Sequence, residues 1–293
     1  MANNIIELEN RPEHISQLKA ARRLYTKAGY YSTAYIIFCV LIPIIISIGR
    51  IFFHSVAPIV LHILMAYSLV ALIVGFILES QNSKCRKIAA KIQQLFDSKV
   101  FGLEWDTHLW EEKPSLEDVN DNIGNLLDEE FVNWYNPQIE GLNQIEAILI
   151  CQRTNLVYDS KLRKRYNSII DGIAWSFLII ILFVAFYKNE GIQTAIVFVG
   201  VPLVPIIKWF LATRKQNLAD INRCETLNSF IDDCLEKIKK DSIAINECTL
   251  YRIQDGIYRH RKVAFKIPDF LYKHMRNSQE KNINVMVNQL AHK

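Results

Sequence analysis

The chain has 293 residues, of which 51% are hydrophobic and 22% charged, and its formal net charge at pH 7 is +4. The average hides two kinds of sequence, because a few long apolar stretches alternate with a strongly charged remainder. A soluble protein of this length would show shorter and periodic apolar runs, so the pattern argues against an ordinary soluble domain.

Four long apolar stretches occur as two close pairs. They cover Tyr31–Gly49, Val56–Leu78, Ile169–Tyr187 and Gly191–Ala212. Because about 20 apolar helical residues cross a hydrocarbon core about 30 Å thick, we predict four transmembrane helices in two hairpins. The expected fold class is an all-α membrane protein, with a helical cytosolic domain formed by the insert between the hairpins and the C-terminal tail.

Basic residues flank the two pairs on the outside, whereas the hairpin loops hold only Arg50 and Lys188. Since lysine and arginine mark the cytoplasmic side of short loops, we predict that both termini and the middle segment face the cytoplasm. The predicted domains are a cytosolic N-terminal segment (1–30), transmembrane hairpin 1 (31–78), a cytosolic insert (79–168), transmembrane hairpin 2 (169–212) and a cytosolic C-terminal helical region (213–293).

Apolar residues at helical spacing continue beyond the second and fourth stretches and precede the third. This spacing predicts helices that pack as a bundle under the membrane, either within one subunit or between subunits. The residues are Ile88, Ile92 and Leu95; Ile139, Leu142, Ile145 and Leu149; and Leu218, Ile221, Leu227, Ile231, Leu235 and Ile238.

Residues 104–146 hold twelve acidic residues and one basic residue, Lys113, which gives a local charge of −11. Because anionic lipid headgroups repel such a segment, we expect it to lie away from the bilayer. Its aromatic residues, among them Trp105, Trp110 and Trp134, supply surface to bury, so we do not expect disorder. The segment is either a solvated acidic face or a surface that docks on a basic patch.

The segment Cys151–Tyr166 holds five basic residues together with Gln152, Asn155 and Asp159. Membrane anchoring explains the charges, because each base near an anionic surface contributes about 1 kcal/mol. The alternative is a site where arginine forks bind phosphate or carboxylate groups. A second basic group lies in the tail. The candidate ligand-binding residues are Arg153, Asn155, Lys161, Arg163, Arg165, Arg259 and Arg261.

Ionisable residues are scarce in the apolar stretches, where Asp171 and Lys208 lie near the cytoplasmic ends, so the sequence indicates no proton relay. Pro202 and Pro205 make the fourth stretch the candidate gating helix, because proline removes a backbone donor and kinks a helix. The alternative is that packing tolerates these bends.

Signatures of catalysis and of metal binding are missing. The chain has no GxGxxG, P-loop, GxSxG or HExxH motif, and its six cysteines form no CxxC pair and no metal-ligand spacing with histidine. We therefore predict no enzyme activity, no catalytic residue, no metal site and no cofactor.

Five segments carry a resemblance to a known family: Phe96–Trp105, Trp134–Tyr135, Cys151–Tyr166, Gln254–Arg261 and Pro268–Tyr272. In their order around two hairpins they resemble the SMODS-associated four-transmembrane effectors of bacterial nucleotide-signalling defence, over almost the full length. The resemblance implies an anti-phage effector of abortive infection. A partner nucleotidyltransferase makes a cyclic oligonucleotide, and the effector then disrupts the bacterial inner membrane by oligomeric pore formation.

We therefore expect a homo-oligomer in the lipid bilayer that is gated by a cyclic oligonucleotide messenger and binds neither DNA nor RNA directly. Two alternatives remain open: a membrane-anchored adaptor that recruits a partner protein through its cytosolic domain, and a small ion channel.

Overall fold

The structure is a computed structural model in which residues 3–43, 58–187, 201–240 and 245–268 are described, with a few positions between 271 and 290. All regular elements of these residues are helices. They are α1 (Ile5–Glu9), α2 (Pro12–Tyr35), the π-helical turn η1 (Ile36–Leu41), α4 (Pro58–Phe101), α5 (Thr107–Trp110), α6 (Leu116–Asn120), the 3-10 turns η2 (Asp128–Glu130) and η3 (Pro137–Ile139), α7 (Gln144–Tyr187), α9 (Val201–Lys239) and α10 (Glu247–Val263).

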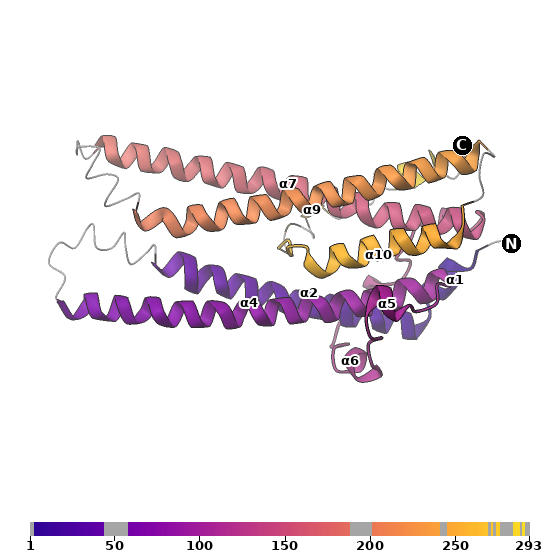
Figure 1. Cartoon of the computed structure of the whole chain (residues 1–293), viewed down its shortest axis with the longest axis horizontal. Helices are drawn as coiled ribbons and strands as arrows, with labels where there is room; N and C mark the ends of the chain where they lie inside the picture. Colours follow the sequence, from indigo (N-terminus) through magenta and orange to yellow (C-terminus); the bar gives the residue numbers. More distant parts are fainter. Residues whose placement is uncertain are drawn as a thin grey trace.

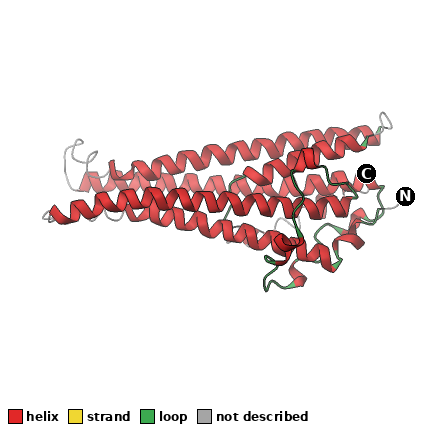
Figure 2. Cartoon of the chain, turned by 60° about the horizontal axis from the view of Figure 1, so that its bottom comes forward, coloured by secondary structure: helices red, strands yellow, loops and turns green. Residues whose placement is uncertain are grey.

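Two long helical pairs lie side by side. Helix α2 packs along α4, and α7 packs along α9, while α10 lies between the two pairs near the end that holds both chain termini (Figure 1). The view in Figure 2 shows the same elongated bundle. The short elements between α4 and α7 lie at that end, and this segment, residues 102–143, is called the insert from here on. Helices α4, α5, α7 and α9 all contact α10.

Local sequence explains where several helices begin and end. Pro12 takes the first position of α2, where its missing N–H is not needed. Helix α4 ends because Gly102 adopts a positive φ of 70°, which lets the Leu103 N–H reach the Ser98 carbonyl at 2.8 Å. Helix α10 begins where the Asn246 side chain accepts a hydrogen bond from the Thr249 N–H at 3.1 Å.

The main hydrophobic core is formed by buried side chains of the insert, α4, α7, α9 and α10, so it connects the two helical pairs. Trp110 of the insert is fully buried and stacks on Tyr251 of α10, with ring centroids 5.6 Å apart. The Tyr135 ring stacks on Phe96 of α4 and contacts Phe101 of α4 at a tilted angle. The insert is thus an integral part of the core, as its aromatic content predicts.

The predicted apolar stripes mostly face this core. Ile92 and Leu95 of α4 and Ile231 and Leu235 of α9 are buried, whereas Leu218 is exposed. The stripe that begins at Ile139 is helical only in part, because residue 139 ends a 3-10 turn and α7 starts at residue 144. Packing of one of these stripes between subunits stays a prediction.

The prediction of an all-α membrane protein with four transmembrane helices is wrong. No helix formed by the described residues is both long enough and apolar enough to cross a bilayer. In α4 and α7 the apolar stretches share one continuous helix with long charged segments, and the first, second and fourth stretches extend into residues outside the described ranges. The all-helical part of that prediction is confirmed for the described residues.

The predicted domain limits fall inside helices. Helix α4 runs across residues 78–79, α7 across 168–169 and α9 across 212–213 without a break. The division into domains stays a prediction, and Pro202 and Pro205 lie in α9, where their gating role also stays a prediction.

The acidic segment 104–146 is anchored by a few ion pairs. Glu111 contacts Lys91 at 3.2 Å and also pairs with Lys262, and Asp128 contacts Lys19 at 2.6 Å. These pairs connect the insert to α2, α4 and α10.

Candidate ligand-binding site

A cavity of about 560 Å³ lies where the two helical pairs, the insert and α10 meet. Its walls come from α2, α4, the segment 130–137, α7 and residues 257–267. This volume falls within the range of pockets that hold small molecules and cofactors. Among the described residues that line it are five basic side chains and two carboxylates: Arg22, Arg86, Arg163, Arg261 and Lys266, with Glu130 and Asp159.

Arg163 of α7 is the centre of a buried ionic network. Its Nε donates to Asp159 at 2.7 Å, and its Nη1 donates to Asp220 at 3.0 Å and to Asn217 at 3.1 Å. Burial acts to lower the pKa of Arg163, but Asp159 and Asp220 outweigh burial and raise it. Two carboxylates thus hold this guanidinium in place as a structural charge.

Arg261 of α10 is held in a similar way by a buried carboxylate. It forms an ion pair with Asp97 of α4, which is 1% exposed. Asp97 also accepts hydrogen bonds from Tyr135 Oη and from Gln254 Nε2, both at 2.9 Å. Burial acts to lower the pKa of Arg261, but Asp97 raises it. The partner carboxylate lies behind the wall, while the guanidinium borders the cavity.

Arg86 of α4 has a different environment. Its Nη1 donates to the backbone carbonyls of Val263 at 2.9 Å and Ala264 at 2.8 Å, which are carbonyls at the C-terminal end of α10. Its Nε is buried and has no hydrogen-bond partner in the described part of the chain. Burial lowers the pKa of Arg86, although Asp220 and Glu79 act to raise it. This half-buried cation is suited to an incoming anion.

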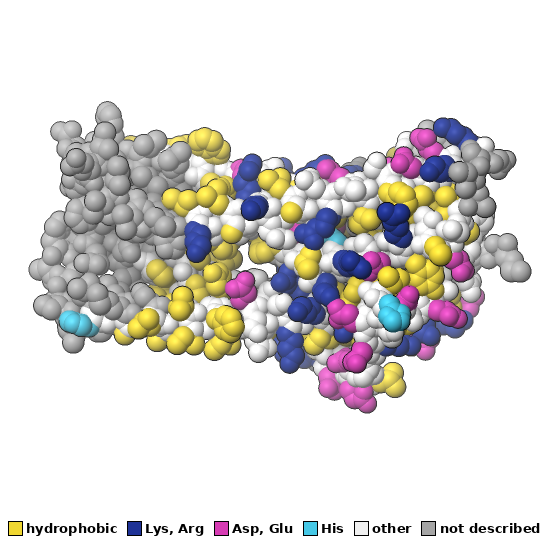
Figure 3. Space-filling model, in the orientation of Figure 1, with side chains coloured by type: hydrophobic (Ala, Val, Ile, Leu, Met, Phe, Trp, Pro, Cys, Tyr) yellow, Lys and Arg dark blue, Asp and Glu magenta, His cyan; other side chains and the backbone are white. Residues whose placement is uncertain are grey.

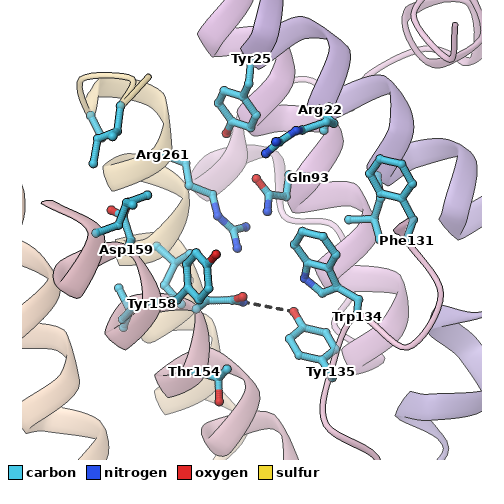
Figure 4. Close-up of a pocket in the computed structure, with 18 of the residues that line it drawn as sticks. Arg22, Tyr25, Gln93, Phe131, Trp134, Tyr135, Thr154, Tyr158, Asp159 and Arg261 are labelled. Carbon is cyan, nitrogen blue, oxygen red and sulfur yellow. Dashed lines mark hydrogen bonds between the residues drawn. The ribbon is translucent and has the colours of Figure 1, made fainter. Parts of the chain in front are cut away.

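Aromatic and amide side chains complete the lining. Figure 4 shows Tyr25, Gln93, Trp134 and Tyr158 around the same space as the guanidinium groups of Arg22 and Arg261. The dashed line that ends at Tyr135 is the hydrogen bond from Asn155 Nδ2 to Tyr135 Oη, at 3.2 Å. Flat aromatic faces beside cations and amides can hold a ligand that has both rings and negative charge.

The structure brings together three of the seven candidate ligand-binding residues. Asn155, Arg163 and Arg261 line the cavity. Arg153 lies elsewhere and pairs with Asp232 at 2.6 Å, and Arg259 pairs with Asp255 at 2.8 Å on the surface. The remaining two, Lys161 and Arg165, are exposed on α7. A binding role for each of the seven stays a prediction.

Sequence analysis did not single out Arg86, Gln93 or Lys266 as binding residues. Arg86 was used only as a flanking charge, and its place in the cavity depends on the packing of α10 against α4. Trp134 could have been chosen as a candidate from the sequence, because it belongs to a segment that carries the family resemblance.

One group at the cavity edge has the composition of a metal site. Asp159, Cys224 and His260 come from α7, α9 and α10, and their ligand atoms lie within 4.8 Å of one another. Burial acts to raise the pKa of Asp159, but Arg163 and His260 hold it well below its ordinary value. Burial raises the pKa of the Cys224 thiol, and Asp159 raises it further. Cys224 is therefore a thiol in this environment and not a free thiolate nucleophile.

Comparison with known proteins identifies the family. The family model described as the SMODS-associating 4TM effector domain matches residues 3–290. A protein of Bacillus cereus (strain VD146) named "Probable CBASS effector molecule" is 23% identical over 274 residues, which cover 92% of this chain and 92% of the relative. No solved structure matches the chain significantly. The resemblance in the sequence is confirmed, because the match extends over nearly every residue: the chain belongs to the SMODS-associating 4TM effector family.

Proposed function

We propose that this chain is a membrane-acting effector of an anti-phage abortive-infection system, and that an anionic nucleotide messenger bound in the cavity switches it on. An effector role agrees with the family and with the name of the Bacillus cereus relative. The observation that carries the nucleotide part is the cavity itself, which combines five basic side chains with aromatic faces at the junction of both helical pairs.

Each part of a nucleotide has a matching group in the lining. A phosphate fits beside Arg86, whose buried Nε has no hydrogen-bond partner among the described residues. Bases can stack on Trp134 or Tyr158, and the amides of Gln93 and Asn155 can bind base edges. A cyclic oligonucleotide from a partner nucleotidyltransferase is the messenger class that we expect.

The position of the cavity suits a switch. A bound ligand contacts α2 and α4 from one helical pair, α7 from the other, and α10 between them. Binding shifts the protein toward an active arrangement only as far as the ligand binds that arrangement more tightly. A ligand that contacts both helical pairs binds more tightly to the arrangement whose spacing fits it. Its affinity therefore differs between the active and the inactive arrangement.

The far end of the bundle supports an action on membranes. Large apolar side chains are exposed there on α4 and α7, among them Leu72, Phe76, Ile179 and Phe183. In Figure 3 the described atoms at that end are mainly hydrophobic, whereas charged residues cover the end with the termini. Extended apolar surface marks contact with a membrane or with other protein chains. We expect this surface to meet lipid and further copies of the chain at the bacterial inner membrane, and the assembled copies to make the membrane leaky.

Leakage from liposomes tests this function. The purified chain is added to dye-filled liposomes, and a panel of cyclic di- and trinucleotides is then added. We expect leakage only with a member of the panel, and we expect Arg86→Gln to reduce it while Arg11→Gln, an exposed arginine outside the cavity, does not. Leakage without any nucleotide would indicate a constitutive channel, and no leakage with the whole panel would contradict the proposed gating.

A further inference from the structure

Three potential metal ligands converge at the edge of the cavity from three different helices. His260 Nε2 lies 2.6 Å from Asp159 Oδ2 and 3.4 Å from Cys224 Sγ, and Cys224 Sγ lies 3.7 Å from Asp159 Oδ2. Cys224 is fully buried and His260 is 3% exposed. A nitrogen, a sulfur and an oxygen donor within this distance form the ligand set that zinc prefers.

From this convergence we infer that Asp159, Cys224 and His260 bind one Zn²⁺ ion. Zinc bonds of about 2.0 Å to nitrogen and oxygen and about 2.3 Å to sulfur, at tetrahedral angles, separate the ligand atoms by about 3.3–3.5 Å. The two distances from Cys224 Sγ already lie near these values. Only the contact between His260 and Asp159 has to widen, because a hydrogen bond there gives way to the ion.

The charged groups around the cluster are close to balanced before a metal binds. Asp159 and Asp220 share the buried guanidinium of Arg163, so these three groups carry a formal charge of −1, which the partly exposed Arg223 offsets from its contact with Asp220. A zinc ion with a Cys224 thiolate adds one positive charge next to them. The thiol proton of Cys224 leaves to solvent when the metal binds.

The imidazole of His260 exchanges its hydrogen bond with Asp159 for the metal. Its Nδ1 is buried and has no partner in the described part of the chain. In the metal-free state Nε2 contacts Asp159, and in the zinc-bound state the proton lies on Nδ1, so Nδ1 is unpaired in both states. Arg163 Nε donates to the same Asp159 Oδ2 that faces His260 and Cys224, so when zinc binds this oxygen the carboxylate has to turn to offer its other oxygen to Arg163.

The fourth coordination position faces the cavity. Asp159 and His260 both line it, whereas Cys224 lies behind them. Three protein ligands with one open position leave room for water or for a ligand oxygen. The zinc site is inferred from its ligands alone and does not depend on nucleotide binding.

Metal titration of the full-length chain tests the inference. The chelator-treated protein is dialysed against Zn²⁺ and analysed for bound metal, and Co²⁺ is used as a spectroscopic probe of a thiolate ligand. We expect one Zn²⁺ per chain and a thiolate-to-cobalt charge-transfer absorption. Cys224→Ser should weaken zinc binding by about 100-fold or more, because even changes outside the ligand set cost about 10- to 100-fold.

Cys234→Ser is the matched control, since Cys234 is also buried in α9 but lies outside the cluster. This variant should bind zinc like the parent chain. Circular dichroism establishes that both variants are folded, and if Cys224→Ser does not fold, the cobalt absorption of the parent chain decides. Absence of that absorption, or equal zinc binding by Cys224→Ser and the parent chain, would overturn the inference.

Discussion

Arg261 on α10 and Asp97 on α4 form an ion pair whose carboxylate is almost completely buried. Since Tyr135 of the insert and Gln254 of α10 also donate to Asp97, one carboxylate joins α4, the insert and α10 behind the cavity wall. The position of α10 in the bundle therefore depends on this contact.

Replacing Arg261 should destabilise the fold strongly. Arg261→Gln leaves the Asp97 charge buried without its cation, so we expect the free energy of unfolding to fall by about 3–5 kcal/mol in urea denaturation. The control is Arg11→Gln, because Arg11 contacts Glu7 at 3.1 Å on the surface and should lose less than about 1 kcal/mol. Similar losses in the two variants would show that the Arg261–Asp97 pair does not support the fold.

Arg163→Lys tests whether the planar, multiple-donor guanidinium group of Arg163 is needed for the stability of the fold. Arg163 donates to Asp159, Asp220 and the Phe265 carbonyl from one planar group, and a lysine ammonium cannot reach all of these acceptors. We expect a loss of about 2–3 kcal/mol in the free energy of unfolding, since buried acceptors are left unpaired. Arg214→Lys, at an exposed pair with Asp171, should change stability by less than about 1 kcal/mol. An unchanged unfolding midpoint for Arg163→Lys would rule out this role.

Glu9 should make stability depend on pH. Its side chain is fully buried, and its Oε2 accepts a hydrogen bond from the Tyr135 N–H at 3.0 Å. Burial raises the pKa of Glu9 from 4.5 to about 8, although the Tyr135 hydrogen bond acts to lower it. Between these two values the unfolded chain has lost the proton that the folded chain keeps, so this group makes the folded state less stable as pH rises.

Glu9→Gln should remove that dependence. The free energy of unfolding of the variant, minus that of the parent chain, should rise by up to about 1.4 kcal/mol per pH unit across the window from 4.5 to about 8. Urea denaturation at several pH values measures this difference. A difference that stays constant with pH would mean that the Glu9 pKa is not raised in the folded chain.

Gly102→Ala should weaken the end of α4. Gly102 has a φ of 70°, which an alanine side chain disfavours, so we expect a loss of about 1 kcal/mol in the free energy of unfolding. Gly141→Ala is the control, because Gly141 has no positive φ and an added Cβ there contacts nothing within 4 Å. Thermal unfolding of both variants gives the comparison, and an equal change in both would contradict the role of Gly102.

The sequence predicted the helical class and most of the buried stripe residues, because apolar periodicity reflects burial directly. It also placed Asn155 and Arg163 in a binding segment, and both line the cavity. The sequence could not show that Arg163 lines the cavity while Arg153 and Arg165 do not. These residues lie on different faces of α7, and which face is buried depends on how α9 and α10 pack against it.

Contacts between residues far apart in the sequence could not be predicted from the sequence. Asp97 and Arg261 are 164 positions apart, and Cys224 and His260 are 36 apart, so no spacing rule connects them. The prediction of four membrane spans was also wrong, because no helix formed by the described residues is both long enough and apolar enough to cross a bilayer. The apolar runs of α4 and α7 continue without a break into charged helix, which the length of an apolar run does not reveal.

Binding of a cyclic oligonucleotide to the purified chain tests the central claim most directly. Isothermal titration of a panel of cyclic di- and trinucleotides should find one that binds the parent chain and Arg11→Gln equally. Arg86→Gln should bind it about 10- to 100-fold more weakly, because a charge-assisted hydrogen bond to phosphate contributes about 1.5–3 kcal/mol. Binding that is unchanged in folded Arg86→Gln, or no binding of any member of the panel, would contradict the account.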